Sequence, residues 1–188
     1  MVTNTIVREF MKPVEEFPRV SQDATFREAV AALEKAREEF SAGRGKQFTL
    51  LVEGEKGQII GKVSPMDVLR CLEPGYVNVI DSSGLRFKDV NYVVESMRDK
   101  MKLWAKPFDD LCHTASNRKV QDFMRRPSQS TRVKASDSMD MAFHHFLSDR
   151  HDSLFVSDGD TVVGVLKFSD VYRAVSKQII DVCVMSPE

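Results

Sequence analysis

The chain has 188 residues, of which 42% are hydrophobic and 29% are charged, and its formal net charge is −1. A globular chain of this length forms one large domain or two small ones, with enough core to fold without disulfides. The balanced charge excludes a protein that holds nucleic acid through a broadly basic surface, because such binding requires many Lys and Arg side chains at the phosphates.

The first short segment of the chain recurs later in the sequence. Val7–Lys12 (VREFMK) matches Val120–Arg125 (VQDFMR). The same offset aligns two predicted short strands, Pro18–Ser21 and Thr131–Lys134. Self-similarity of this kind indicates a duplicated structural unit.

An amphipathic helix is predicted after the short strand in both copies. Thr25 and Glu28 have the spacing of a capping box, and Ser138 occupies the equivalent cap position in the second copy. Glu39–Gln47 has no counterpart in the second copy and is predicted to be a flexible insert. Both helices carry apolar residues at i, i+3, i+4 and i+7, which form one face: Phe26, Ala29, Val30 and Leu33, then Met139, Ala142, Phe143 and Phe146.

A β-hairpin and a second helix complete each copy. Short apolar runs on either side of a Gly-containing turn are typical of a hairpin: Thr49–Val52 and Gln58–Val63, then Ser153–Val156 and Thr161–Leu166. The closing helices are predicted at Pro65–Leu72 and at about Phe168–Ile179. Each copy is therefore expected to run strand, helix, strand, strand, helix.

A long connector separates the two copies. Within it, a helix is predicted from Lys88 to Ala105 and is stopped by Pro107, because the residue before a proline avoids the helical region. Its apolar side chains fall on one face: Val90, Val93, Val94, Met97, Met101 and Trp104. Two interpretations of this face are open, namely packing against the rest of the chain and contact with a second copy or a partner protein.

The most closely repeated stretch joins the hairpin to the closing helix. Residues 61–70 (GKVSPMDVLR) and 164–173 (GVLKFSDVYR) share Gly, Asp, Val and Arg. The shared acids, Asp67 and Asp170, fall in the first helical turn, where a carboxylate complements the helix dipole. Capping explains Asp67, because Ser64 is a good N-cap. It explains Asp170 less well, because Lys167 at the matching cap position cannot accept from a backbone N–H.

The same geometry suits a phosphorylated sugar. A helix N-terminus presents free N–H groups to a phosphate, and a hydroxyl at the cap adds a donor. A carboxylate one turn on can accept hydrogen bonds from the two vicinal hydroxyls of a ribose. Because the arrangement occurs twice, at matching places in a duplicated unit, it favours a nucleotide-binding role.

With these motifs the chain resembles a tandem pair of CBS (cystathionine-β-synthase) domains, the arrangement called a Bateman module. The resemblance covers Val7 to about Leu72 and Val120 to about Lys177. It implies a mixed α+β fold in which two βαββα repeats pack about a pseudo-twofold axis. The expected boundaries are residues 1–73 for the first repeat, 74–119 for a connector with an amphipathic helix, and 120–188 for the second repeat.

The resemblance also implies a site. Members of this family bind AMP, ADP, ATP, S-adenosylmethionine or NAD(H) in clefts between the repeats. The family motif assigns the ribose hydroxyls to Asp67 and Asp170 and a phosphate contact to Ser64. Lys167 departs from the motif, and two interpretations are open: its ammonium group replaces the hydroxyl at the phosphate, or it points to solvent and the second cleft is empty. The expected pocket walls are Phe17, Pro18, Val63, Thr131 and Leu166.

The expected function is a regulatory module without catalytic activity. It would sense an adenine nucleotide (AMP, ADP or ATP), form a homodimer and signal by contact with an unidentified regulated protein. The alternatives are a binder of S-adenosylmethionine or NAD(H), and a structural or interaction protein that kept the fold without the ligand. Neither nucleic acid nor a membrane is an expected partner.

Cysteine and histidine patterns agree with this expectation. Cys71, Cys112 and Cys183 are odd in number and far apart, which is typical of reduced thiols in a cytoplasmic protein. No apolar run approaches the ~20 residues of a membrane-spanning helix. The adjacent residues His144 and His145 would point in different directions on a helix, so no metal site is expected.

Overall fold

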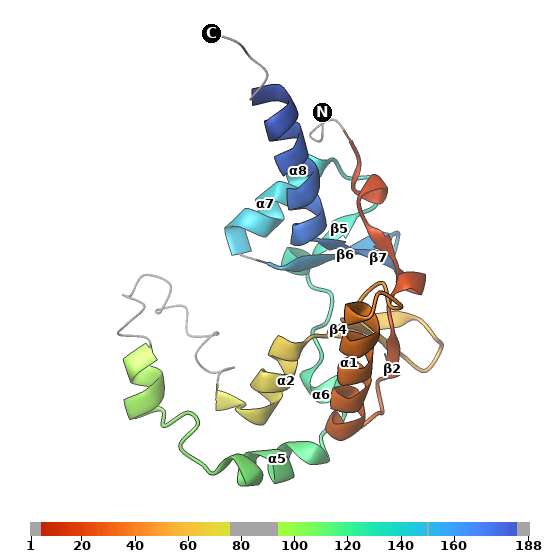
Figure 1. Ribbon diagram of the computed structural model, residues 1–188. Helices are drawn as coiled ribbons and strands as arrows, with labels where there is room; N and C mark the ends of the chain where they lie inside the picture. Colours follow the sequence, from red (N-terminus) through yellow and green to blue (C-terminus); the bar gives the residue numbers. More distant parts are fainter. Residues whose placement is uncertain (1–4, 76–93, 150, 184–188) are drawn as a thin grey trace. The chain divides into compact units, whose positions relative to one another are not determined.

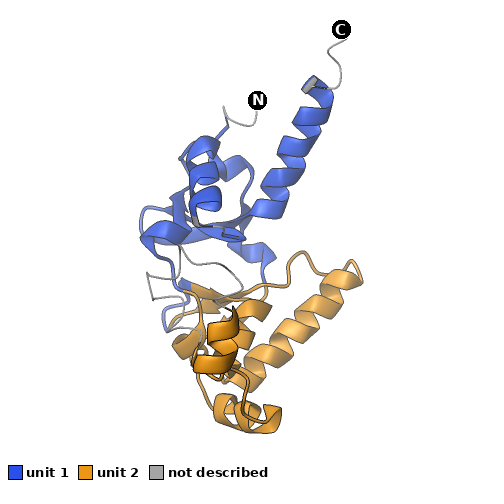
Figure 2. Ribbon diagram, turned by 90° about the vertical axis from the view of Figure 1, so that its left-hand side faces the viewer, with its two compact units in different colours: residues 1–17, 55–60, 126–188 blue, residues 18–54, 61–125 orange. Residues whose placement is uncertain are grey.

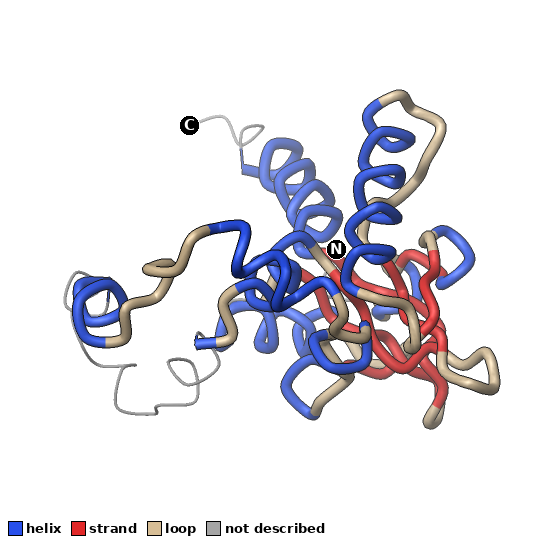
Figure 3. Tube along the Cα trace, turned by 90° about the horizontal axis from the view of Figure 1, so that it is seen from below, coloured by secondary structure: helices blue, strands red, loops and turns tan. Residues whose placement is uncertain are grey.

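The structure is a computed structural model that describes residues 5–75, 94–149 and 151–183 (Figure 1). Helices and strands are mixed along the chain, which confirms the predicted α+β class (Figure 3). The chain divides into two compact units (Figure 2). Unit 1 contains residues 1–17, 55–60 and 126–188, and unit 2 contains residues 18–54 and 61–125.

Unit 1 is built on a four-stranded sheet of order β1-β7-β6-β5. The strands are β1 (Lys12–Pro13), β5 (Arg132–Lys134), β6 (Ser153–Asp158) and β7 (Thr161–Lys167). β7 runs antiparallel to both β1 and β6, and β5 runs parallel to β6. The helices are α7 (Met139–Asp149) and α8 (Phe168–Cys183), with 3-10 turns η2 (Val7–Glu9), η3 (Val14–Glu16) and η6 (Gln129–Thr131).

Unit 2 is built on a three-stranded sheet of order β2-β3-β4. Its strands are β2 (Arg19–Ser21), β3 (Leu50–Glu53) and β4 (Ile59–Val63), and β2 runs parallel to β3. The boundary between the units falls within β4. The helices are α1 (Phe26–Ser41), α2 (Pro65–Leu72), α5 (Phe108–Ser116) and α6 (Val120–Phe123), with a π-helix η5 (Ser96–Lys100).

Each unit combines segments of both sequence copies. β1 comes from the start of the first copy and pairs with β7 of the second, with Lys12 opposite Val165. At the matching place in unit 2, Lys62 of β4 pairs with Arg125 from the start of the second copy. Two backbone hydrogen bonds of 2.9 and 3.0 Å join that pair. The opening segments are therefore exchanged between the copies, and the repeat boundaries at residues 73 and 119 stay a prediction.

We call residues 61–70 the first junction and residues 164–173 the second junction. The glycine at the start of each junction makes room for the exchanged segment. A Cβ atom on Gly164 would lie 2.7 Å from the backbone oxygen of Lys12. A Cβ atom on Gly61 would lie 2.7 Å from Met124 Sδ and 3.0 Å from the backbone oxygen of Arg125. A glycine in a strand often marks such a close approach of another backbone. Packing thus accounts for the recurrence of Gly in the junction motif.

The amphipathic helices have the predicted caps and faces. At the start of α1, the Thr25 amide donates to Glu28 Oε2 at 2.7 Å, and the Glu28 amide donates to Thr25 Oγ1 at 3.3 Å. This reciprocal pair confirms the capping box. Three of the four predicted positions in each helix are buried: Phe26, Ala29 and Leu33 in α1, and Met139, Ala142 and Phe146 in α7.

The predicted insert is partly helical, so the prediction was wrong for Glu39–Ser41. α1 continues to Ser41 because its second half consists of good helix formers, with an ion pair between Glu34 and Arg37 on one face. The chain turns only at Gly43, whose φ of 71° suits glycine. α8 likewise continues past its predicted end, to Cys183.

The connector helix ends earlier than predicted. Residues 76–93, including Val90 and Val93, lie outside the described residues; η5 stops at Lys100 rather than Ala105. Lys102 and Trp104 have φ values of 51° and 62°, which are incompatible with a continuing helix.

Pro107 does not end a helix but precedes one. It is the N-cap of α5, which sequence analysis missed. Leu111 and Ala115, one turn apart, are the buried residues of this helix.

Candidate functional site

The first junction lies at the start of α2 in unit 2. Ser64 is the N-cap and has an extended backbone, while Pro65 occupies the first helical position. Proline suits that position because its missing N–H would have no helical acceptor there. Asp67 follows at the third position, and its side chain is only 4% exposed. The first turn of α2 therefore contains a buried carboxylate, that of Asp67.

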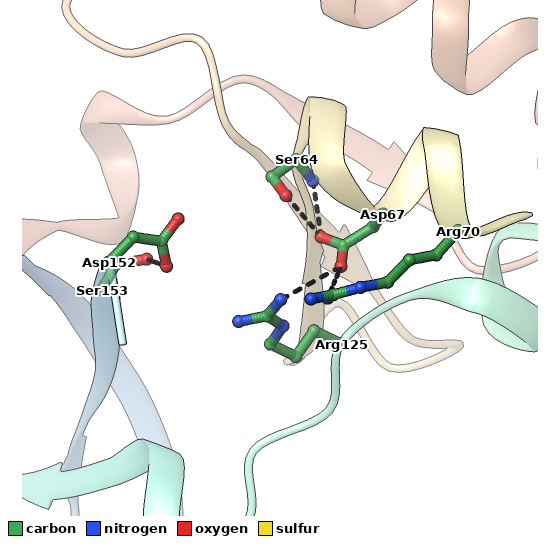
Figure 4. A network of polar contacts seen from close by, with 6 residues as sticks. All are labelled: Ser64, Asp67, Arg70, Arg125, Asp152 and Ser153. Atoms are coloured by element: carbon green, nitrogen blue, oxygen red, sulfur yellow. Dashed lines mark hydrogen bonds and ion pairs between the residues drawn. The ribbon is translucent and has the colours of Figure 1, made fainter. Parts of the chain in front are cut away.

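Four donors surround this carboxylate (Figure 4). Its Oδ2 accepts from the Ser64 backbone N–H at 2.9 Å and from the Ser64 hydroxyl at 2.6 Å. Its Oδ1 lies 3.3 Å from Arg70 Nη1 and 3.4 Å from Arg125 Nη2. The predicted pair of Ser64 and Asp67 is thus brought together, with the hydroxyl bonded to the acid.

Neither arginine was predicted to contact Asp67. Arg70 stands three residues after Asp67, a spacing that brings side chains together on a helix and that could have been noticed. Arg125 reaches the site because its backbone pairs with Lys62, next to the junction. In the sequence, Arg125 stands in a basic cluster with Arg126 that could meet ligand phosphates, and it matches the cationic Lys12 of the first copy. Neither feature places it beside Asp67.

The second junction lies at the start of α8 in unit 1 and has different contacts. Asp170 Oδ1 is 3.9 Å from Arg173 Nη1, which is too long for a hydrogen bond, and the Arg173 side chain is 83% exposed. Asp170 Oδ2 is buried and has no hydrogen-bond partner. A buried acceptor in this state is uncommon and costly in free energy. Lys167 is the last residue of β7 and is half-buried.

The predicted pocket walls are mostly interior residues. Val63 and Leu166 have no exposed area, Phe17 is 4% exposed and Thr131 is 6% exposed. The Thr131 hydroxyl accepts from the Ser128 amide at 2.9 Å, so part of its capacity serves η6. Pro18 uses its carbonyl to accept from the Leu51 amide at 2.9 Å, beside β3. That these residues line a ligand remains a prediction.

A separate hollow of about 560 Å³ lies in unit 1, between η6 and α7. His145 Nδ1 is 3.1 Å from the Ser130 carbonyl oxygen at its edge. The hollow is open, and it is lined by residues with polar side chains that present mostly apolar atoms to it: Ser128, Gln129, Ser130, His144, His145 and Ser148. It contains none of the residues predicted for the site.

The described part of the chain has free thiols but no cluster of metal-binding side chains. Within it, no group of three or more His, Cys, Asp or Glu side chains is placed to hold a metal ion. Cys71 and Cys112 are free thiols. Burial raises the pKa of the Cys71 thiol, and nearby Arg118 offsets part of that effect. Among the described helices, none is both long and apolar enough to cross a membrane.

One part of the chain matches a known protein family. Residues 120–177 match the family model of the CBS domain. The comparison with curated proteins finds no match.

Solved structures share the fold along nearly the whole chain. A structure of CBSX2 in complex with AMP is 18% identical, with a TM-score of 0.58, over 93% of this chain and 98% of that one. CBSX2 from Arabidopsis thaliana is 20% identical over 94% and 97% of the two chains, with a TM-score of 0.52. A CBS domain-containing protein from Kribbella flavida is 21% identical over 92% and 99%, also with a TM-score of 0.52.

Proposed function

We propose, from the premise that this chain has the fold of a tandem CBS pair and carries a CBS domain at residues 120–177, that it is a regulatory module for an adenine nucleotide. AMP, ADP and ATP are the ligand class, and the output is contact with another protein. Asp170 and Asp67 accept the ribose hydroxyls, while Ser64 and Lys167 lie near the phosphates. The apolar surroundings come from Phe17, Pro18, Val63, Thr131 and Leu166.

The buried, unpartnered Oδ2 of Asp170 is the observation that carries this proposal. An ionised carboxylate without a donor is destabilising in a protein interior. A hydroxyl of a bound ribose would supply the missing donor. Capping does not explain the acid, because Lys167 stands where the capping side chain would be. That a structural neighbour was solved with AMP supports the choice of ligand class.

The test is a thermal-shift series on the full chain with AMP, ADP, ATP, adenosine, S-adenosylmethionine and NADH. A ligand at a hundredfold its dissociation constant adds about 2.7 kcal/mol to the free energy of unfolding. For a chain of this size that raises the midpoint by roughly 5–10 °C. We expect such a rise with at least one of AMP, ADP and ATP, and a much smaller one in Asp170→Asn.

The matched control is Asp160→Asn, which removes the same charge from an exposed residue in the turn between β6 and β7. It should keep the full ligand-induced rise. Flat curves with every compound would contradict the nucleotide proposal and favour an interaction protein that has the fold alone. A rise with S-adenosylmethionine or NADH only would move the ligand to those alternatives.

Exposed apolar side chains on α8 support the protein-contact part of the proposal. Tyr172, Ile179, Ile180 and Val182 are each at least 52% exposed. Isolated exposed apolar residues are common, but several on one helix are typical of an interface. A homodimer is the simplest partner, and sedimentation equilibrium of wild type and Ile180→Glu tests it. A monomer at all concentrations in wild type would contradict it.

A further inference from the structure

All the acceptor positions of the Asp67 carboxylate are occupied. A carboxylate has about four lone-pair sites. Two on Oδ2 are taken by the Ser64 amide and hydroxyl, and two on Oδ1 by Arg70 and Arg125. A ribose can therefore bind to this acid only by displacing donors that are already there.

The distances indicate which donors yield. The Ser64 contacts are 2.9 and 2.6 Å, whereas the Arg70 and Arg125 contacts are 3.3 and 3.4 Å. Charge-assisted bonds between nitrogen and oxygen are normally about 2.7–2.9 Å long. The guanidinium groups are thus the loosely held partners, and a diol would take the Oδ1 positions.

Arg125 can release the acid without leaving the site. Its backbone is fixed by the two hydrogen bonds to Lys62, and Gly61 lies against its carbonyl oxygen. Only the side chain, which is 23% exposed, has to turn. The side chain of Arg70 is 37% exposed, and its backbone is fixed because it lies within α2.

The local charge then decides which ligands are accepted. Among the described contacts of Asp67, two guanidinium groups face one carboxylate, so these three groups together carry one positive charge in excess. When a diol occupies the carboxylate, both cations lose their partner in a partly buried place, where an unpaired charge is costly. A ligand that brings phosphate oxygens restores the pairing, and guanidinium binds phosphate well. A neutral nucleoside does not restore it, and a cationic sulfonium compound makes the excess larger.

We propose that Arg125, together with Arg70, makes the Asp67 site selective for nucleotides that carry phosphate. Arg125 is the specificity-determining residue, because it exchanges Asp67 for the phosphate when the nucleotide binds. Adenosine and S-adenosylmethionine are rejected at this site. The inference rests on the proposed nucleotide-binding function and adds the charge of the ligand to it.

The test is isothermal titration calorimetry of ATP, AMP and adenosine with the full chain. Wild type is compared with Arg125→Gln, and both are repeated in the Asp170→Asn background, so that binding at the second junction is weakened. In Arg125→Gln we expect ATP to bind at least tenfold more weakly and adenosine at least as tightly as in wild type. Arg126→Gln removes the same charge one residue further on, and it should leave the ratio of ATP to adenosine affinity within about twofold.

The variant Arg125→Lys is a control that distinguishes a loss of charge from a loss of folding. It keeps the charge, so its affinity ratio should lie between those of wild type and Arg125→Gln, and circular dichroism melts establish that each variant is folded. An unchanged ratio in folded Arg125→Gln overturns the inference but leaves the proposed function intact. Loss of all binding in Asp170→Asn alone also overturns it, because Asp67 would then hold no ligand. Wild type that binds none of the three compounds overturns the proposed function itself.

Discussion

Asp67 and Asp170 stand at matching places in two junctions that share their Gly, Asp, Val and Arg, yet their surroundings differ. Asp67 is bonded to Ser64 and contacts two arginines, whereas Asp170 has one buried oxygen without a donor. Two substitutions accompany the difference, and the arginine that both junctions share lies 3.3 Å from Asp67 but 3.9 Å from Asp170. Lys167 replaces the serine at the cap, and Lys12 stands where Arg125 stands in the other unit.

This comparison shows how a duplicated unit can keep an acid and change its contacts. Lys12 pairs with β7 through its backbone, as Arg125 does with β4, but no ion pair to Asp170 occurs among its described interactions. One acid therefore stabilises its own helix and the exchanged segment that crosses it. The other has one buried oxygen without a hydrogen-bond partner and, among its described contacts, a single ion pair of 3.9 Å, to Arg173.

The largest expected effect is a difference in the free energy of unfolding between the variants Asp67→Asn and Asp170→Asn. Asp67→Asn weakens the contacts to Arg70, Arg125 and Ser64, and hydrogen bonds to charged groups contribute about 1.5–3 kcal/mol. We expect the free energy of unfolding to fall by about 2–3 kcal/mol, as a net value for the cluster. Asp170→Asn removes a charge that has no donor on Oδ2, so without ligand its free energy of unfolding should equal or exceed that of wild type. Urea unfolding without ligand measures both.

Equal losses in the two variants would show that the acids have equivalent surroundings. That result would remove the basis for treating Asp170 as the free acceptor. Asp160→Asn in the exposed turn again serves as the control, with no measurable change expected.

The second prediction concerns the two glycines. In Gly164→Ala the new Cβ meets a backbone oxygen at 2.7 Å, which cannot move without disturbing β1. In Gly61→Ala the nearest atom is the flexible Met124 Sδ, which can turn away. Overpacking typically costs 1–3 kcal/mol, so we expect about 2–3 kcal/mol for Gly164→Ala and about 1 kcal/mol for Gly61→Ala. Thermal and urea unfolding provide the values.

A control comes from the glycine at the tip of the first hairpin. Gly57 has open space around its Cβ position but a φ of 76°, so Gly57→Ala tests backbone strain without crowding. If Gly61→Ala proves more harmful than Gly164→Ala, then the exchanged segment holds unit 2 more rigidly than unit 1, contrary to the geometry.

Much of this arrangement could be predicted from the sequence, because it depends on short-range patterns. The capping box of Thr25 and Glu28, the buried face of α1 and the bounds of α2 follow from spacing along one element. The repeat showed that Asp67 and Asp170 are equivalent in position. It could not show that Arg125 contacts Asp67, because Arg125 stands 58 positions further along the chain.

The exchange of the opening segments is the clearest example of what spacing could not reveal. VREFMK and VQDFMR look like the starts of their own copies, and nothing in a linear pattern says on which sheet they pack. The recurring Gly61 and Gly164 were the only trace, since close backbone approach requires glycine. α5 was missed for a different reason: Pro107 was taken as a stop signal, although proline also precedes helices and Asp109 and Asp110 suit a first turn.

The smallest expected effects on the free energy of unfolding are those of substitutions at the two cap positions, Ser64 and Lys167. Ser64→Ala removes a 2.6 Å hydrogen bond to Asp67 and should lower the free energy of unfolding by about 1–1.5 kcal/mol. Lys167→Ala should change it by about 0.5 kcal/mol or less, because Lys167 cannot cap the helix. The consequence of Lys167→Ala should instead appear in binding: if its ammonium group lies at the phosphates, ATP and ADP affinity should fall about fivefold, a free-energy change of about 1 kcal/mol, and adenosine affinity should not change. Calorimetry on the two variants decides between the two interpretations of Lys167. Equal losses of affinity for ATP, ADP and adenosine would place this side chain away from the phosphates. Asp170 would then be the only residue of its junction that contributes to binding.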